Sequence, residues 1–172
     1  MYSIEQLCYE PVGGATPRKG DQELYTDSGI KFLRILNIQP NEIKLTDVKY
    51  IQEDVHEGSL KRSQLNADDV LMTITGRVGT AALVEKNILP ANINQHIVRL
   101  RVLGDNCLPG YLAAYLNTTL GLVVSNRSVS GGTRFALDYG AIKAISIPLP
   151  PIEVQESVIT EVQNRRNEAR RL

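Results

Sequence analysis

The feature that most constrains the fold is a stretch, residues 69–101, in which short apolar runs alternate with polar side chains. Residues 70–75 carry the two-residue alternation typical of a strand, and residues 80–84 return to an apolar run. The two glycines between these runs permit a tight turn. The pattern predicts a pair of adjacent strands with Arg77 at its tip, where the guanidinium group would be presented to solvent.

A further strand is predicted over residues 92–102, after a break at a proline. Amide and imidazole side chains stand at its start, at Asn92, Asn94, Gln95 and His96, and apolar residues follow on one face. Side chains of these types suit hydrogen bonding to a ligand better than covalent chemistry. The 69–101 stretch therefore predicts both a core and a binding site.

Five segments of the chain resemble the target recognition domain of the specificity subunit in type I restriction-modification systems. The segments are Gly14-Ala15-Thr16-Pro17, Gly29-Ile30-Lys31-Phe32-Leu33-Arg34 with Asn37-Ile38, Asp69-Val70-Leu71 with Thr73-Ile74-Thr75-Gly76, Asn92-Ile93-Asn94-Gln95-His96, and Ile147-Pro148-Leu149-Pro150-Pro151 with Gln155. Each segment alone is a weak signal. All five occur in the family's order and rough spacing, and together they span most of the chain.

The resemblance implies an α+β fold. We expect a mixed, strongly twisted sheet or half-barrel with a few flanking helices over residues 1–150, followed at residues 151–172 by the start of a long spacer helix of the coiled-coil type. The resemblance implies double-stranded DNA as the ligand, and the methylation and restriction subunits of the system as partners. The chain would be a non-catalytic subunit that directs those partners to a target site. Family members read different sites from one framework, so the motifs do not reveal the target sequence.

Two further polar stretches are predicted to be loops that contact DNA. The first follows a glycine pair and carries Arg18 and Lys19, which would lie along a phosphate backbone; a solvated turn is the alternative. The second, residues 126–139, is rich in glycine, hydroxyl and arginine groups that could donate to phosphates or base edges. The residues expected to contact DNA are Arg18, Lys19, Thr75, Arg77, Asn92, Asn94, Gln95, His96, Arg127, Ser130, Gly131, Thr133 and Arg134.

The distribution of charge agrees with a nucleic-acid ligand. The chain has 19 Lys and Arg against 19 Asp and Glu, so its net charge is zero. Residues 1–58 carry a net charge of −4, residues 59–148 of +4 and residues 149–172 of zero. A local excess of positive charge is enough to displace counterions from phosphates, whatever the total. Accidental segregation of solvated charges is the competing interpretation.

The C-terminal segment predicts a helix that needs a partner. A proline run at residues 148–151 ends the preceding extended segment, and residues 152–172 contain neither glycine nor proline. Apolar residues recur there three, four or seven positions apart, as in a helix with one buried face. We expect this helix to contact a second recognition domain, a second copy of the chain or a methylation subunit.

The sequence lacks the motifs of the enzymes that act on DNA. An adenine methyltransferase would need a glycine-rich cofactor loop and an Asn/Asp-Pro-Pro-aromatic motif, and Leu149-Pro150-Pro151-Ile152 is not that motif. No clustered carboxylates mark a metal-dependent nuclease, and two cysteines with two histidines do not form a zinc-spaced set. We expect no metal, no organic cofactor, and two thiols that lie in the core or on the surface.

Two alternatives stay open at this point. The chain could be the C-terminal recognition domain of a fused methyltransferase-endonuclease, or an assembly module that contacts no DNA. No apolar run approaches the length of a membrane span, and the first residues lack the pattern of a signal peptide, so the cytoplasm is the expected location.

Overall fold

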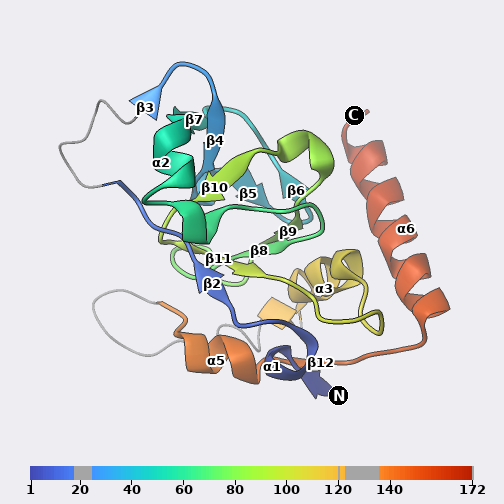
Figure 1. The fold of residues 1–172 in the computed structure, drawn as a ribbon. Coiled ribbons are helices and arrows are strands. Elements are labelled where there is room, and N and C mark those ends of the chain that lie inside the picture. The colour runs from blue at the N-terminus through green and yellow to red at the C-terminus, as the bar shows by residue number, and fades with distance from the viewer. Residues whose placement is uncertain (18–24, 120, 123–135, 172) are drawn as a thin grey trace.

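The computed structural model describes residues 1–17, 25–119, 121–122 and 136–171. Short helices surround the strands, and one long helix lies along one side of the molecule (Figure 1). In chain order the strands are β1 (Tyr2–Ser3), β2 (Val12–Gly13), β3 (Tyr25–Thr26), β4 (Ile30–Leu33), β5 (Ile38–Gln39), β6 (Glu42–Ile43), β7 (Lys49–Ile51), β8 (Val70–Thr73), β9 (Ala81–Leu83), β10 (Ala91–Ile93), β11 (Ile97–Leu100) and β12 (Ser146–Ile147). The α-helices are α1 (Ile4–Leu7), α2 (Glu53–Glu57), α3 (Pro109–Leu116), α5 (Tyr139–Ala144) and α6 (Ile152–Ala169), and the 3-10 helices are η2 (Ile35–Asn37), η3 (Lys61–Ser63) and η4 (Lys86–Ile88). This mixture confirms the predicted α+β class. The described strands form several separate sheets and no closed barrel, so the half-barrel is not confirmed.

The first sheet has the strand order β2-β11-β8-β9 and is antiparallel throughout. Met72 in β8 lies opposite Ala81 of β9 and Val98 of β11. β8 and β9 are therefore the predicted strand pair, and the loop at residues 74–80 that joins them carries Arg77.

The second sheet has the order β10-β4-β7-β3, and β10 runs parallel to β4. The prediction of a single strand over 92–102 is wrong, because the chain turns at residues 94–96 and continues as β11 in the other sheet. The Asn94 side chain accepts a hydrogen bond from the His96 backbone N–H (Oδ1 to N, 3.1 Å), and such a local bond replaces extended pairing. The 94–96 turn therefore lies where the chain passes from one sheet to the other.

Buried apolar side chains cover both faces of the first sheet. Val70 and Met72 pack with residues of α1, α3 and α5, whereas Leu71 packs with Leu33 and Ile93 of the second sheet. All of β8 is buried as a result. A strand that is covered on both faces carries apolar residues at consecutive positions, which explains its composition.

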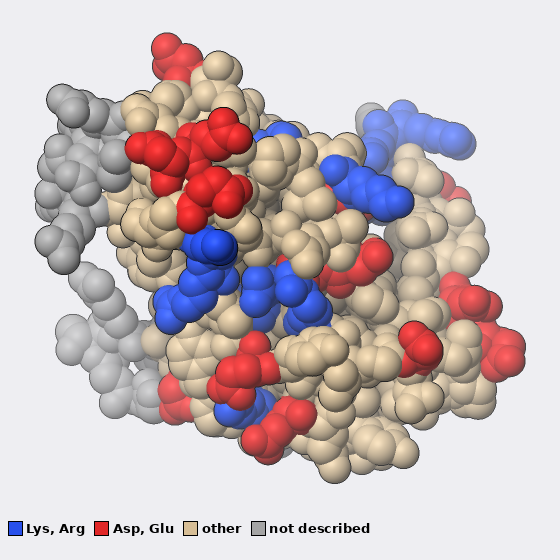
Figure 2. All heavy atoms as spheres, in the orientation of Figure 1, with Lys and Arg blue, Asp and Glu red and all other residues tan. Residues whose placement is uncertain are grey.

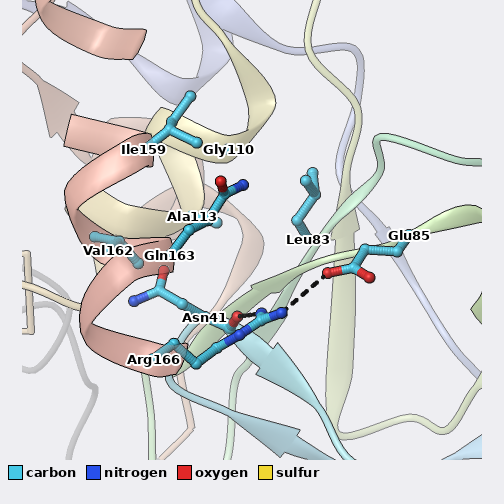
Figure 3. A pocket seen from close by; sticks show the side chains of 9 residues that line it. All are labelled: Asn41, Leu83, Glu85, Gly110, Ala113, Ile159, Val162, Gln163 and Arg166. Atoms are coloured by element: carbon cyan, nitrogen blue, oxygen red, sulfur yellow. Dashed lines mark hydrogen bonds and ion pairs between the residues drawn. The ribbon is translucent and has the colours of Figure 1, made fainter. Parts of the chain in front are cut away.

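α6 confirms the predicted helix after the proline run, and it lies against α3. Its Ile159 and Val162 line a small pocket together with Gly110 and Ala113 of α3 (Figure 3). Gln155, at the start of α6, is fully buried. Its Oε1 accepts from the Leu108 N–H at 2.8 Å, and its Nε2 donates to the carbonyls of Asn106 and Pro150 at 2.9 Å each.

Arginines in the last turns of α6 bind residues next to the strands. Arg166 donates to the Asn41 carbonyl (2.8 Å) and lies 3.4 Å from a Glu85 oxygen (Figure 3), and Arg170 pairs with Glu42. The apolar residues that predicted an external partner are only partly covered by the chain itself, since Ile159 and Val162 are half-buried and Ala169 is exposed. Contact of this helix with a partner therefore stays a prediction. The role of a spacer between domains is not confirmed, and the domain boundary in front of α6 stays a prediction.

Candidate nucleic-acid interface

Polar side chains from three distant segments meet beside the 94–96 turn. The Thr16 hydroxyl donates a hydrogen bond to Gln95 Oε1, and the Thr75 hydroxyl lies 2.9 Å from His96 Nδ1. Beneath these contacts the Ile74 backbone N–H donates to the His96 carbonyl (3.0 Å). We name Thr16, Thr75, Gln95 and His96 the polar edge.

His96 is held from two sides and is open on a third. Its ring Nδ1 contacts Thr75, and its backbone N–H donates to Asn94 Oδ1 at 3.1 Å. The side chain is half-buried. Within the described part of the chain Nε2 has no hydrogen-bond partner, and it is not among the buried unpaired atoms. Nε2 is therefore free to bond a ligand, as a donor or an acceptor according to the tautomer.

Gly14 brings the first of these segments against the turn. A Cβ atom at this position would lie 2.0 Å from the Ile93 carbonyl oxygen and 2.4 Å from that of Asn94. Only glycine permits this approach, which carries Thr16 to Gln95. The sequence analysis singled out the Gly14-Ala15-Thr16-Pro17 motif but did not select Thr16, because a hydroxyl in a loop carries no pattern of its own.

Asn92, although predicted to contact DNA, is enclosed in the interior with zero exposure. Its Nδ2 donates to the Leu60 carbonyl (2.8 Å) and the Ser63 hydroxyl (3.1 Å), and its Oδ1 bonds His56 Nδ1. Asn94 is also buried, and its side chain shapes the turn. Both amides therefore have structural partners, and the exposed amide of the group belongs to Gln95.

Arg77 lies in the loop between β8 and β9 and is exposed, as its sequence position predicts. Its Nη1 donates to Gln39 Oε1 of β5 at 3.3 Å. Gly76 and Gly79 have φ values of +68° and +89°, and this left-handed backbone is the reason for glycine on both sides of Arg77. No described carboxylate pairs with Arg77.

The remaining predicted DNA contacts, Arg18, Lys19, Arg127, Ser130, Gly131, Thr133 and Arg134, lie outside the described residues. Ala136, which follows the second of these stretches, forms a bridge with Thr75. The Leu137 backbone N–H donates to the Ile74 carbonyl at 3.0 Å. The chain thus returns directly to the polar edge after the glycine-rich stretch.

The two cysteines are buried in the core, the first of the two environments that the sequence left open. Burial raises the pKa of Cys8 to about 12 and that of Cys107 to about 11, so both thiols stay protonated at neutral pH.

Across 1–17, 25–119, 121–122 and 136–171, no group of three or more His, Cys, Asp or Glu side chains is placed to hold a metal ion. In the same residues no helix has the length and apolar character of a membrane span.

The chain is similar to two curated specificity subunits of type I restriction enzymes. The chain is 28% identical over 160 residues to the type I restriction enzyme EcoBI specificity subunit of Escherichia coli, a match covering 91% of this chain and 31% of that protein. It is 26% identical over 118 residues to the EcoEI specificity subunit of the same organism, covering 66% of this chain and 18% of that one. The chain thus spans less than a third of the length of either relative.

Solved structures share the fold. One is a chain described under "Structural basis underlying complex assembly and conformational transition of the type I R-M system", with a TM-score of 0.71 and 18% identity over 97% of this chain and 38% of that chain. Another is the HsdS subunit of Thermoanaerobacter tengcongensis, with a TM-score of 0.66 and 18% identity over 96% of this chain and 37% of that one. The family described as type I restriction modification DNA specificity domain matches residues 1–163. The chain therefore belongs to that family.

Proposed function

We propose that this chain binds double-stranded DNA at a specific sequence, as the specificity subunit of a type I restriction-modification complex or as half of one. The observation that carries the proposal is the polar edge, where an exposed amide and a half-buried imidazole are fixed by hydroxyl partners from other segments. Amide and imidazole groups can donate to and accept from base edges, which is the chemistry of direct readout.

The support beneath the polar edge suits readout of sequence. Gln95 and His96 stand on a turn between β10, which is buried at every position, and β11, which is buried at every position except Arg99. Their partners Thr16 and Thr75 belong to segments with further contacts, one through the close approach of Gly14 to the turn and one through the bridge to Ala136. Discrimination between bases requires side chains that are held in place before binding, because a mobile group adapts to the wrong base.

We propose further that Arg77 contacts the same duplex, since it projects from the loop that also carries Thr75 and has no carboxylate partner in the described chain. The undescribed stretches with Arg18, Lys19 and Arg134 remain part of the proposal through their sequence alone. Methylation and cleavage would be carried out by the partner methylation and restriction subunits, in the cytoplasm where the DNA and these subunits are found.

A selection from random duplexes tests the proposal. The chain, alone and with its methylation subunit, should enrich one sequence motif, and a Gln95→Ala/His96→Ala double variant should lose that enrichment. Lys86→Ala/Asn87→Ala, which alters two exposed residues of η4, is the matched control and should enrich the same motif. Failure of the unaltered protein to enrich any duplex at low salt, with and without the methylation subunit, would contradict the proposal.

A further inference from the structure

A group of cations that are not part of the polar edge lies on one face of the molecule (Figure 2). Figure 2 shows Lys and Arg side chains gathered across the middle of this face, over the segment that follows α2 and over β11. Lys61 and Arg62 of η3 are exposed, and Arg99 of β11 is half-buried. We name these three residues the basic band. The positive charge of residues 59–148 was noted from the sequence, but the Lys61-Arg62 pair was interpreted as a solvated face and none of the three was among the expected DNA contacts.

Hydrogen bonds bring η3 and β11 together although they are far apart in sequence. Arg99 Nη1 donates to the carbonyl of Gln64, the residue that ends η3, at 2.8 Å. Arg62 Nη2 reaches the Gly13 carbonyl at 3.5 Å, and Gly13 pairs with Val98, next to Arg99. Arg99 is thus anchored on the segment of Arg62, and Arg62 on β2, the strand beside Arg99, each through one nitrogen.

The charges of the basic band are not neutralised within the described chain. The neighbouring Arg101 forms a bidentate ion pair with the buried Asp69, with N–O distances of 2.7 and 2.9 Å. Lys61, Arg62 and Arg99 have no carboxylate partner among the described residues. Arg99 Nε is buried and makes no hydrogen bond there, and burial together with Arg101 lowers the pKa of Arg99, with Asp69 opposing the shift only in part. A partly buried cation beside a like charge is an unfavourable arrangement that a bound anion relieves.

We infer that the basic band binds the phosphate backbone of the same duplex, outside the bases that the polar edge reads; this rests on the proposed function. The two sites are continuous, because Gly13, which contacts Arg62, is three residues from Thr16 and an extended chain covers that separation in about 10 Å. The exposed acidic residues of α2, seen in Figure 2 beside the band, repel phosphate on that side and so restrict the path of the backbone.

A phosphate contact has a signature that differs from base readout. It supplies affinity without sequence information, and each contact adds about 0.9 to the slope of log affinity against log salt concentration. A Lys61→Gln/Arg62→Gln variant should therefore weaken binding of the selected duplex and of single-mismatch duplexes by the same factor. Its salt slope should fall by about two, and the preference among sequences should stay unchanged.

The measurement is a titration of the chain with both duplexes at several salt concentrations. Lys44→Gln/Lys86→Gln removes the same charge from two exposed lysines on other segments and should keep the wild-type slope. Arg99→Gln is a second variant of the band, and it should lower the slope by about one. Urea unfolding of each variant verifies that it is folded.

Three outcomes overturn the inference. A wild-type slope in both basic-band variants would show that the band contacts no phosphate. A loss confined to the selected duplex would make it a base-reading site instead. Loss of binding to the methylation subunit, with DNA binding intact, would assign the band to an acidic protein surface. If the wild-type protein bound no duplex at all, the proposed function itself would fall, and the inference with it.

Discussion

Asn92 and His96 are four residues apart and carry similar chemistry, yet the structure gives them opposite environments. Asn92 is fully buried and bonded to His56, Leu60 and Ser63, whereas His96 is half-buried with one ring nitrogen open. The difference shows that one short motif can hold both a polar residue that bonds the interior and a polar residue with a donor or acceptor left open, and under the proposed function the second kind contacts the ligand. Four substitutions test this division, from the largest expected effect to the smallest.

Asn92→Leu should cause the largest loss of stability. It keeps an apolar side chain of similar size but leaves His56 Nδ1, the Leu60 carbonyl and the Ser63 hydroxyl without the amide that bonds them. Several unpaired buried groups should lower the free energy of unfolding by about 3 kcal/mol. Urea denaturation measures this. Asn87→Leu, on the exposed side of η4, is the control. An equally small loss of unfolding free energy in both variants would show that the buried hydrogen bonds of Asn92 do not stabilise the fold.

Gly14→Ala should affect both stability and binding. The new Cβ would meet the Ile93 and Asn94 carbonyl oxygens at 2.0 and 2.4 Å, so the segment must move away from the 94–96 turn. We expect a loss of about 2 kcal/mol in unfolding free energy, and weaker binding because Thr16 moves with the segment. Gly104→Ala is a comparison with a φ of +69° but no atom within 4 Å of the added Cβ. If Gly14→Ala cost no more than Gly104→Ala, the close approach would not matter.

His96→Ala should weaken binding and spare the fold. Its ring is half-buried and makes one hydrogen bond with the described residues, to Thr75, so unfolding free energy should change by less than about 0.5 kcal/mol. Affinity for the selected duplex should fall about tenfold, equivalent to about 1.4 kcal/mol. Fluorescence anisotropy with selected and mismatched duplexes provides the measurement. Unchanged affinity on every duplex would remove His96 from the interface.

Thr75→Val should have the smallest effect, because it acts only through His96. Valine keeps the shape of threonine but cannot bond His96 Nδ1, which lies 2.9 Å from the Thr75 hydroxyl. We expect about a threefold loss of affinity for the selected duplex, with wild-type affinity restored in Thr75→Ser. The loss should vanish in a His96→Ala background, as a double-mutant cycle would show. An additive loss in that background would mean that Thr75 acts independently of His96.

Strand periodicity predicted the strand pair β8 and β9 correctly, because consecutive residues determine it. The alternation over residues 70–75 identified β8 and its partner β9, since strand periodicity is written into consecutive residues. The 94–96 turn was not predicted. Its cause is the hydrogen bond that Asn94 Oδ1 accepts from the His96 backbone N–H, and the polar residues that form such a turn also occur at the exposed edge of a strand. For the same reason the single strand expected over 92–102 became β10 and β11.

The candidate site was predicted by residue type but not by environment. β10 is buried at every position, so alternation could not separate Asn92 from the exposed Gln95 that follows the strand. The apolar recurrence of α6 correctly indicated a helix, and part of its apolar face packs on α3. It could not indicate that α3 of the same chain covers Ile159, because a periodic pattern describes one surface and not the surface that it meets.

The position of the 94–96 turn has a mechanical consequence. β10 and β11 belong to different sheets, and the backbone between them is three residues long. A force on Gln95 or His96 therefore acts on both sheets at once, and a change in the angle between the sheets displaces both side chains together. Any ligand that prefers one arrangement of these side chains also favours one angle between the sheets, and the preference is reciprocal.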